Sequence, residues 1–229
     1  MTIADTVAPS PSALRLVVAA ERLFALHGID GVSLRQIATE AGSANNSAVH
    51  YHFGSKQGLI TAIFQHRLAR LLSERRLLAA QCDRTDLRSR FEAHYLPLLM
   101  LAEATDNHYV SFVEQLQRRE LGVSTQLADL PNVGQRADDE FHRDLRELLG
   151  HLDEALQDMR ITGAQTLCLH AAADRERAVS SGADVAPFGL FVSALLDGIT
   201  GFLSAPASET TVRHSSGQGD GDTGRLRLL

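Results

Sequence analysis

The chain has 229 residues, 44% of them hydrophobic and 22% charged, and carries a net charge of −6 at pH 7. That length allows a large core, and no apolar run approaches the roughly 18 residues that span a bilayer. The N-terminus lacks the pattern of a secretory signal, and Cys82 and Cys168 stand far apart without metal or CxxC spacing. We therefore expect a reduced, cytoplasmic protein with no membrane segment, no metal site and no cofactor.

The charge is unevenly distributed. Residues 12–76 contain eight basic and four acidic side chains, whereas residues 77–229 contain 14 basic and 23 acidic ones. A basic segment attached to an acidic body indicates an anionic partner for one end of the chain only. The single lysine of the chain, Lys56, lies in this basic segment.

The hydrophobic spacing favours helices nearly throughout, and no alternating strand pattern is convincing, so we expect an all-α fold. Residues 1–11, with two prolines, are expected to form a flexible arm. Ser33 and Ser55 are suitable N-caps, and Gly42 and Gly54 suit the turns. Four helices are predicted in the basic segment, at about 12–27, 34–41, 46–52 and 56–80.

Two short helices around Gly42 predict a helix-turn-helix DNA-binding domain over residues 12–60, which the helix at 56–80 links to the rest. Polar side chains left outside its small apolar core could contact base edges or phosphates. Lys56, at the start of a helix, suits a phosphate. The predicted DNA-binding residues are Ser33, Arg35, Gln36, Asn45, Asn46, Ser47, His50, Tyr51, His52, Ser55 and Lys56.

This segment resembles the DNA-binding domain of TetR-type transcriptional regulators. The family's recognition helix ends in Tyr-x-His/Tyr-Phe, followed by x-Ser-Lys-x-x-Leu. The resemblance covers about residues 12–76. The interval from Gly42 to Phe53 is one residue longer than usual, and His50 stands where the family usually has tyrosine, which suggests a subgroup. The residues that carry the resemblance are Gly31, Ser33, Ile37-Ala38, Ala41-Gly42, Tyr51-His52-Phe53, Ser55-Lys56 and Leu59.

The resemblance implies a second, all-helical domain, here residues 81–204, that binds a small-molecule effector and forms a homodimer. The hydrophobic spacing predicts its helices at about 87–104, 108–120, 136–159, 163–179 and 187–203. The tail, residues 205–229, contains SSGQGDGDTG and is expected to be disordered.

The helix at 187–203 is apolar on most sides, so it must be buried widely, in a core or against a partner. Together with the helix at 163–179 it could build a four-helix dimer interface; the alternative is an ordinary core helix within a monomer. The predicted interface residues are Leu167, Cys168, Ala171, Leu195, Gly198, Ile199 and Phe202.

Apolar walls with a few polar groups are typical of small-molecule sites, although an aromatic and aliphatic stripe can also be mere packing. The predicted effector-binding residues are Phe91, His94, Tyr95, Leu98, Leu99, Met100, Phe112 and Gln115. His170 and Asp174 lie one turn apart and could share a cation. Because no further ligand shows metal spacing, we expect a structural or surface pair.

These observations predict a ligand-responsive transcriptional regulator, a repressor that binds a palindromic DNA operator as a dimer and is released by its effector. No GxSxG, HExxH, P-loop or strand-flanked glycine motif is present, so we do not expect an enzyme. Two alternatives stay open: a helical interaction adaptor without DNA binding, and an all-α enzyme with a site assembled from scattered residues.

Overall fold

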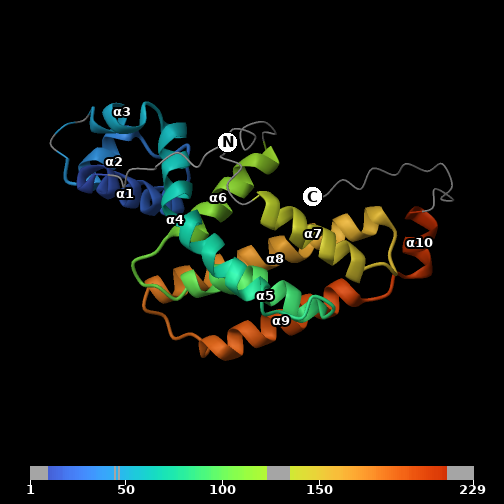
Figure 1. Ribbon diagram of the computed structural model, residues 1–229. Helices are drawn as coiled ribbons and strands as arrows, with labels where there is room; N and C mark the ends of the chain where they lie inside the picture. Colours follow the sequence, from blue (N-terminus) through green and yellow to red (C-terminus); the bar gives the residue numbers. More distant parts are fainter. Residues whose placement is uncertain (1–9, 44, 46, 123–134, 216–229) are drawn as a thin grey trace.

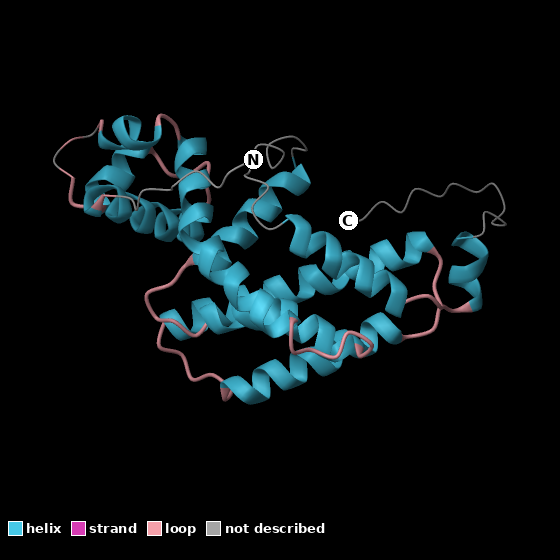
Figure 2. Cartoon of the chain, viewed as in Figure 1, coloured by secondary structure: helices cyan, strands magenta, loops and turns pink. Residues whose placement is uncertain are grey.

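The computed structural model describes residues 10–43, 45, 47–122 and 135–215, and these residues form helices and turns without a strand (Figure 1; Figure 2). The predicted all-α fold class is thereby confirmed. The helices are α1 (Pro11–His27), α2 (Leu34–Glu40), α3 (Ala48–Phe53), α4 (Lys56–Ala79), α5 (Leu87–Leu101), α6 (Tyr109–Gly122), α7 (Gln135–Leu148), α8 (Glu154–Ser180), α9 (Phe188–Ser204) and α10 (Glu209–Ser215).

Helices α1 to α3 form a small domain at one end of the molecule, and α4 leads from it into a larger bundle of α5 to α9 (Figure 1). In this arrangement α1 packs against α2 and α4 within the small domain and also against α6 of the bundle. The two parts therefore meet along α1, and not only through the connecting helix.

Side-chain caps explain where the helices of the small domain begin. Ser33 Oγ accepts a hydrogen bond from the Gln36 N–H at 3.3 Å, and Gln36 Oε1 accepts one from the Ser33 N–H at 2.7 Å, a reciprocal capping box. Ser55 Oγ accepts from the Gly58 N–H at 3.0 Å. A Cβ atom at Gly58 would collide with the Phe53 carbonyl oxygen, so glycine lets α4 start this close to α3. Both predicted serine caps are confirmed.

Aromatic rings join the cores of the two parts. Phe24 of α1 stacks on Phe112 of α6, with ring centroids 6.1 Å apart. The ring of Phe64, from α4, lies 5.6 Å from that of Phe112. All three belong to one continuous cluster of buried apolar residues that runs from α1 to α9. Because this core is shared, the small domain is anchored on the bundle by packing.

The predicted break between helices near residues 160–162 is wrong. Instead, α7 ends at Leu148 and α8 starts at Glu154. The Asp153 side chain caps α8 by accepting a hydrogen bond from the Leu156 N–H at 2.9 Å. Gly163 lies inside α8, where a Cβ would stand 3.1 Å from Cζ of Phe202. This glycine permits close packing of α9 on α8, rather than ending a helix.

The ends of the chain differ in part from expectation. Residues 209–215, within the tail expected to be disordered, form the short helix α10. Residues 1–9 of the predicted arm and residues 216–229 of the tail lie outside the described residues. Among the described helices none is by itself long and apolar enough to cross a membrane; only the bent pair α9 and α10 passes that test together.

The N-terminus of α6 binds carboxylates from both parts of the molecule. Glu21 of α1, 1% exposed, accepts from the His108 N–H at 3.2 Å and forms a bidentate pair with Arg67 of α4, at 2.7 and 2.8 Å. Glu176 of α8 accepts from the N–H groups of Val110 and Ser111 at 3.0 and 2.9 Å. We call this arrangement the α6 clamp.

The clamp satisfies N–H groups that a helix leaves without partners at its start, and it places negative charge at the positive end of the helix dipole. Burial raises the pKa of Glu176, although the hydrogen bonds from Ser111 and Val110 act in the opposite direction. The clamp therefore connects α1, α4 and α8 through one helix end.

We predict that Glu21→Gln lowers the free energy of unfolding by about 3–5 kcal/mol, because it leaves Arg67 largely buried without its charge partner. Glu74→Gln is the matched control, since Glu74 pairs with Arg70 on the exposed face of α4, and it should cost about 0.5 kcal/mol or less. Urea denaturation followed by circular dichroism measures both. Equal costs for the two variants would contradict this assignment.

Candidate functional site

Helix α3 presents an exposed polar face. Val49 is fully buried beneath it, whereas Tyr51 is 83% exposed and His50 is exposed as well. On α2, Arg35 and Gln36 are exposed, and Ile37 is buried. Of the remaining predicted DNA-binding residues, Ser33, Asn45, Ser47 and Ser55 are exposed, His52 and Lys56 are half-buried, and Asn46 lies outside the described residues.

Several of these polar groups also hold the local structure together. Asn45 Oδ1 accepts from the Ser47 N–H at 2.9 Å, just before α3 begins. His50 Nδ1 lies 2.9 Å from the Gly54 carbonyl oxygen, to which it can donate at the end of α3. With the capping roles of Ser33, Gln36 and Ser55, these bonds set the positions of α2, α3 and the start of α4. Tyr51 and Arg35 are left as the large exposed polar side chains of α3 and α2.

Lys56 makes a contact that the sequence did not predict. Its Nζ donates a hydrogen bond to the Ile29 carbonyl oxygen at 2.8 Å, which ties the start of α4 to the turn after α1. An ammonium group has three N–H donors, so this bond leaves two for another acceptor. Lys56 is therefore fixed in place at the N-terminus of α4, where an anion is favoured.

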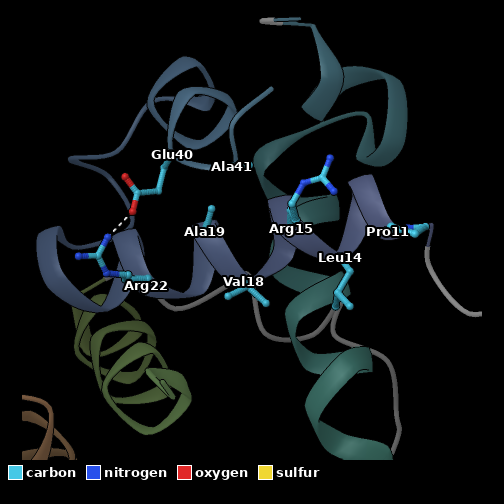
Figure 3. A pocket seen from close by; sticks show the side chains of 8 residues that line it. All are labelled: Pro11, Leu14, Arg15, Val18, Ala19, Arg22, Glu40 and Ala41. Carbon is cyan, nitrogen blue, oxygen red and sulfur yellow. Dashed lines mark hydrogen bonds and ion pairs between the residues drawn. The ribbon is translucent and has the colours of Figure 1, made fainter. Parts of the chain in front are cut away.

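A groove of about 520 Å³ lies on the flank of the small domain, between α1 and α2 (Figure 3). The ion pair of Arg22 with Glu40 closes one end of it. A second cavity, of about 380 Å³, lies where α1, the start of α6 and the end of α8 meet, lined among others by Leu26, His108 and Arg177. None of the predicted effector-binding residues lines either space.

The predicted effector-binding residues do not form one cluster. Phe91, His94 and Tyr95 pack together on α5, with the rings of Phe91 and Tyr95 stacked at 4.6 Å and the rings of His94 and Tyr95 5.0 Å apart. Phe112 instead stacks on Phe24 at the junction with the small domain. Met100 is 53% exposed, unlike its neighbours on α5, and its role in effector binding stays a prediction. Leu98 and Leu99 are buried, and Gln115 is half-buried.

Side chains from other helices complete the group on α5. The ring of Phe141, from α7, stacks on His94 with centroids 3.9 Å apart. Arg75 of α4 donates to the His94 carbonyl oxygen at 2.9 Å. On the α8 side, Gln165 Nε2 lies 3.0 Å from Nε2 of His142. We call this cluster the α5 cluster; its members are Arg75, Phe91, His94, Tyr95, Asp138, Phe141, His142 and Gln165.

Burial, with the nearby charges of Arg75 and Arg90, lowers the pKa of His94 well below its ordinary value, so the ring is neutral at pH 7. Burial also raises the pKa of Tyr95. The sequence did not reveal Arg75, Phe141 or Gln165 as members of this cluster, because they come from three different helices and share no local spacing.

The outer face of α8 and α9 carries exposed apolar and small residues. Leu167 is 47% and Phe202 45% exposed, and Gly198 is exposed. Cys168 and Ile199 are fully buried inside the chain, so predicting them as interface contacts was wrong: they face the packing of α8 with α9 and the bundle. Ala171 and Leu195 are half-buried. Met159 and Leu190, 70% and 62% exposed, were not predicted.

His170 belongs to an ion cluster on α6 and α8. It contacts the Glu114 carboxylate through Nδ1 and lies 3.7 Å from Asp174 through Nε2. Arg177 also pairs with both of these carboxylates. In the described part of the chain, no group of three or more His, Cys, Asp or Glu side chains is arranged to hold a metal ion.

The comparisons with known proteins agree with this architecture. The model of the tetR family of bacterial regulatory proteins matches residues 16–63. The HTH-type transcriptional repressor AcnR of Corynebacterium glutamicum is 32% identical over 81 residues, which cover 34% of this chain and 43% of that repressor. The chain thus matches less than half the length of this curated relative.

Among solved structures, GusR of Salmonella enterica is similar in fold, with a TM-score of 0.51 at 16% identity. That similarity covers 87% of this chain and 99% of GusR, so the fold likeness extends beyond the small domain into the bundle. The matched residues 16–63 run from α1 into α4 and include the whole of α2 and α3. Over these residues the chain is similar to the tetR family of bacterial regulatory proteins.

Proposed function

We propose that the protein is a DNA-binding transcriptional repressor that acts as a homodimer and is released from its operator by a small-molecule effector. The observation that carries the proposal is the exposed polar face of α3, fixed by caps on both sides, in a segment that matches the tetR family model. The match of residues 16–63 to a family of regulatory proteins argues against the enzyme alternative.

The chemistry of α3 suits the major groove, which is wide enough to admit an α-helix. Tyr51 and His50 supply hydrogen-bonding groups and an aromatic surface on the exposed face of α3. Ser55 and Lys56, at the start of α4, supply phosphate contacts that position the helix without reading sequence. Arg35 on α2 adds an exposed cation beside this face.

A homodimer would place two copies of α3 on successive major grooves, and a two-fold protein would favour a palindromic operator. The outer face of α8 and α9 supports this assembly, because it exposes Leu167, Leu190 and Phe202 beside the small residue Gly198. Small residues allow helices to approach closely, and exposed apolar patches are typical of interaction surfaces.

For release, the effector must prefer a conformation in which the two copies of α3 no longer match the operator. We assign effector binding to the bundle, where the α5 cluster groups aromatic rings with polar side chains, as small-molecule sites do. The α6 clamp supplies the physical connection, since it joins α8 of the bundle to α1 of the small domain.

Selection of genomic fragments with the purified full-length protein, followed by fluorescence anisotropy on the enriched duplex, tests the proposal. We expect a palindromic sequence and binding that weakens steeply as salt increases. Failure to enrich any duplex at low salt, with and without cell extract as a source of effector, would contradict DNA binding and favour the adaptor alternative.

On the enriched duplex, Lys56→Ala should weaken binding to all sequences alike. The slope of log affinity against log salt should fall by about 0.9 for each lysine lost, thus by about 1.8 for a dimer. Arg70→Ala is the matched control, because it removes one positive charge from the exposed side of α4, where Arg70 pairs with Glu74. An unchanged slope for Lys56→Ala in a folded protein would exclude its phosphate contact.

The dimer is tested by Gly198→Glu. A Cβ at Gly198 has no neighbour within 4 Å, so the single chain should fold normally, whereas a buried carboxylate would disrupt a two-fold interface. Gly189→Glu is the matched control, because a Cβ at Gly189 is equally open but points to the opposite side of α9. Sedimentation should show a monomer for Gly198→Glu only. A dimer that survives this change would place the interface elsewhere.

A further inference from the structure

We propose that His50 of α3 reads the operator as a hydrogen-bond acceptor. On the DNA strand that it faces, it then selects a base with an exocyclic amino group, adenine or cytosine, over guanine or thymine. This inference rests on the proposed function, because it states which bases the exposed face of α3 recognises. It is carried by the hydrogen bond at one nitrogen of the His50 ring, which determines what the other nitrogen can do.

The His50 ring is held by the end of its own helix. Its Nδ1 lies 2.9 Å from the carbonyl oxygen of Gly54, the residue that follows α3. Gly54 has a φ of +70°, a backbone conformation that favours glycine. The Gly54 N–H in turn donates to the His50 carbonyl oxygen at 3.0 Å, so the two residues are joined twice. The ring is therefore tied to the C-terminal end of α3.

This contact fixes the protonation of the neutral ring. A carbonyl oxygen can only accept a hydrogen bond, so Nδ1 of His50 must carry a proton. In a neutral imidazole one nitrogen is a donor and the other an acceptor, and the bond made by one sets the role of the other. Nε2 makes no hydrogen bond to the residues that the structure describes. The neutral ring thus offers an acceptor, and no donor, to a partner outside the chain.

The acceptor lies on the face of α3 that the proposed function places against DNA. Ser47, His50 and Tyr51 follow the i, i+3, i+4 spacing of one helix face, and all three are exposed. Val49 is buried beneath them. Because Nε2 is the ring nitrogen farther from the backbone, it is presented on the surface that would enter the groove.

The DNA backbone cannot satisfy such an acceptor, because phosphate oxygens also only accept hydrogen bonds. The major groove offers donors at the N6 amino group of adenine and the N4 amino group of cytosine, whereas guanine and thymine present acceptors there. A guanine or thymine would leave two acceptors facing each other. The tyrosine that tetR-type regulators usually carry at this position has a hydroxyl donor, which can bind a phosphate. His50 therefore changes what this position recognises.

Two measurements test the inference, and the first needs no DNA. Long-range proton–nitrogen NMR of the full-length protein, labelled with 15N-histidine, shows which ring nitrogen carries a proton. The spectra are recorded at about pH 8, where an unperturbed imidazole is neutral. His50→Ala, or His50→Gln if the first variant does not fold, identifies the resonances. We expect a proton on Nδ1 and none on Nε2; a proton on Nε2 would overturn the proposal.

The second measurement is a double-mutant cycle on the duplex that genomic selection yields. Each adenine is replaced in turn by purine and each cytosine by 2-pyrimidinone, which removes the amino group. Fluorescence anisotropy then measures the affinity of the natural chain and of the His50 variant. At one position in each half-site, we expect this loss to weaken the natural chain about three- to tenfold more than the variant. Weakened base pairing affects both proteins alike, so the cycle isolates the contact of His50.

His151→Ala is the matched control, because it removes an exposed histidine from the turn between α7 and α8, in the bundle. It should respond to every base analogue as the natural chain does. A scan in which no position distinguishes the His50 variant from the natural chain would overturn the proposal. Coupling of the His50 variant to a methylphosphonate in the DNA backbone, in place of a base, would overturn it as well.

The two measurements also separate this inference from the proposed function. A protein that binds its operator without the coupling, or with a proton on Nε2, refutes the role of His50 alone. A protein that binds no duplex refutes DNA binding, and with it the reading of bases by His50, whichever ring nitrogen carries the proton.

Discussion

The N-terminus of α6 is the point on which the arrangement of the two parts depends. A helix start offers unpaired N–H groups and a partial positive charge, and here carboxylates from two distant helices meet that need. Glu21 comes from α1, and Glu176 from α8. Neither carboxylate could be buried at low cost without these donors. The polar requirement of one helix end therefore fixes the small domain against the bundle.

Helix α4 provides the second connection, again through buried charge. Arg67 and Arg75 lie eight residues apart on this helix. Arg67 makes a close bidentate pair with Glu21, whereas Arg75 makes a long contact with Asp138. The Glu21–Arg67 pair lies at the start of α6, where the small domain meets the bundle, and the Arg75–Asp138 pair joins α4 to α7 within the bundle.

The sequence predicted well where the physical signal is local. Ser33 with Gln36, and Ser55 with Gly58, are caps encoded within four residues, so the small domain and its exposed face could be predicted from the amino-acid sequence alone. Burial in the bundle depends on partners far along the chain. Cys168 was placed wrongly for that reason, since a helical stripe does not show which neighbour covers it.

Arg75, Phe141 and Gln165 likewise converge only in three dimensions. The role of Gly163 could not be predicted from the sequence either. The sequence analysis placed it at the start of a helix, whereas it lies inside α8, and the space it leaves is filled by the ring of Phe202. Whether a glycine ends a helix or admits a neighbour is decided by packing. The exposed polar face of α3 was therefore predictable, whereas the α5 cluster had to be found in the fold.

We infer that the α6 clamp makes the small domain and the bundle open as one cooperative unit. Native-state hydrogen exchange with mass spectrometry tests it most directly, on the natural chain and on Glu176→Gln. We predict that α1 and α8 of the natural chain exchange in one cooperative opening, and that the variant allows α1 to open separately. Independent opening of α1 in the natural chain, or identical exchange in both proteins, would contradict the claim.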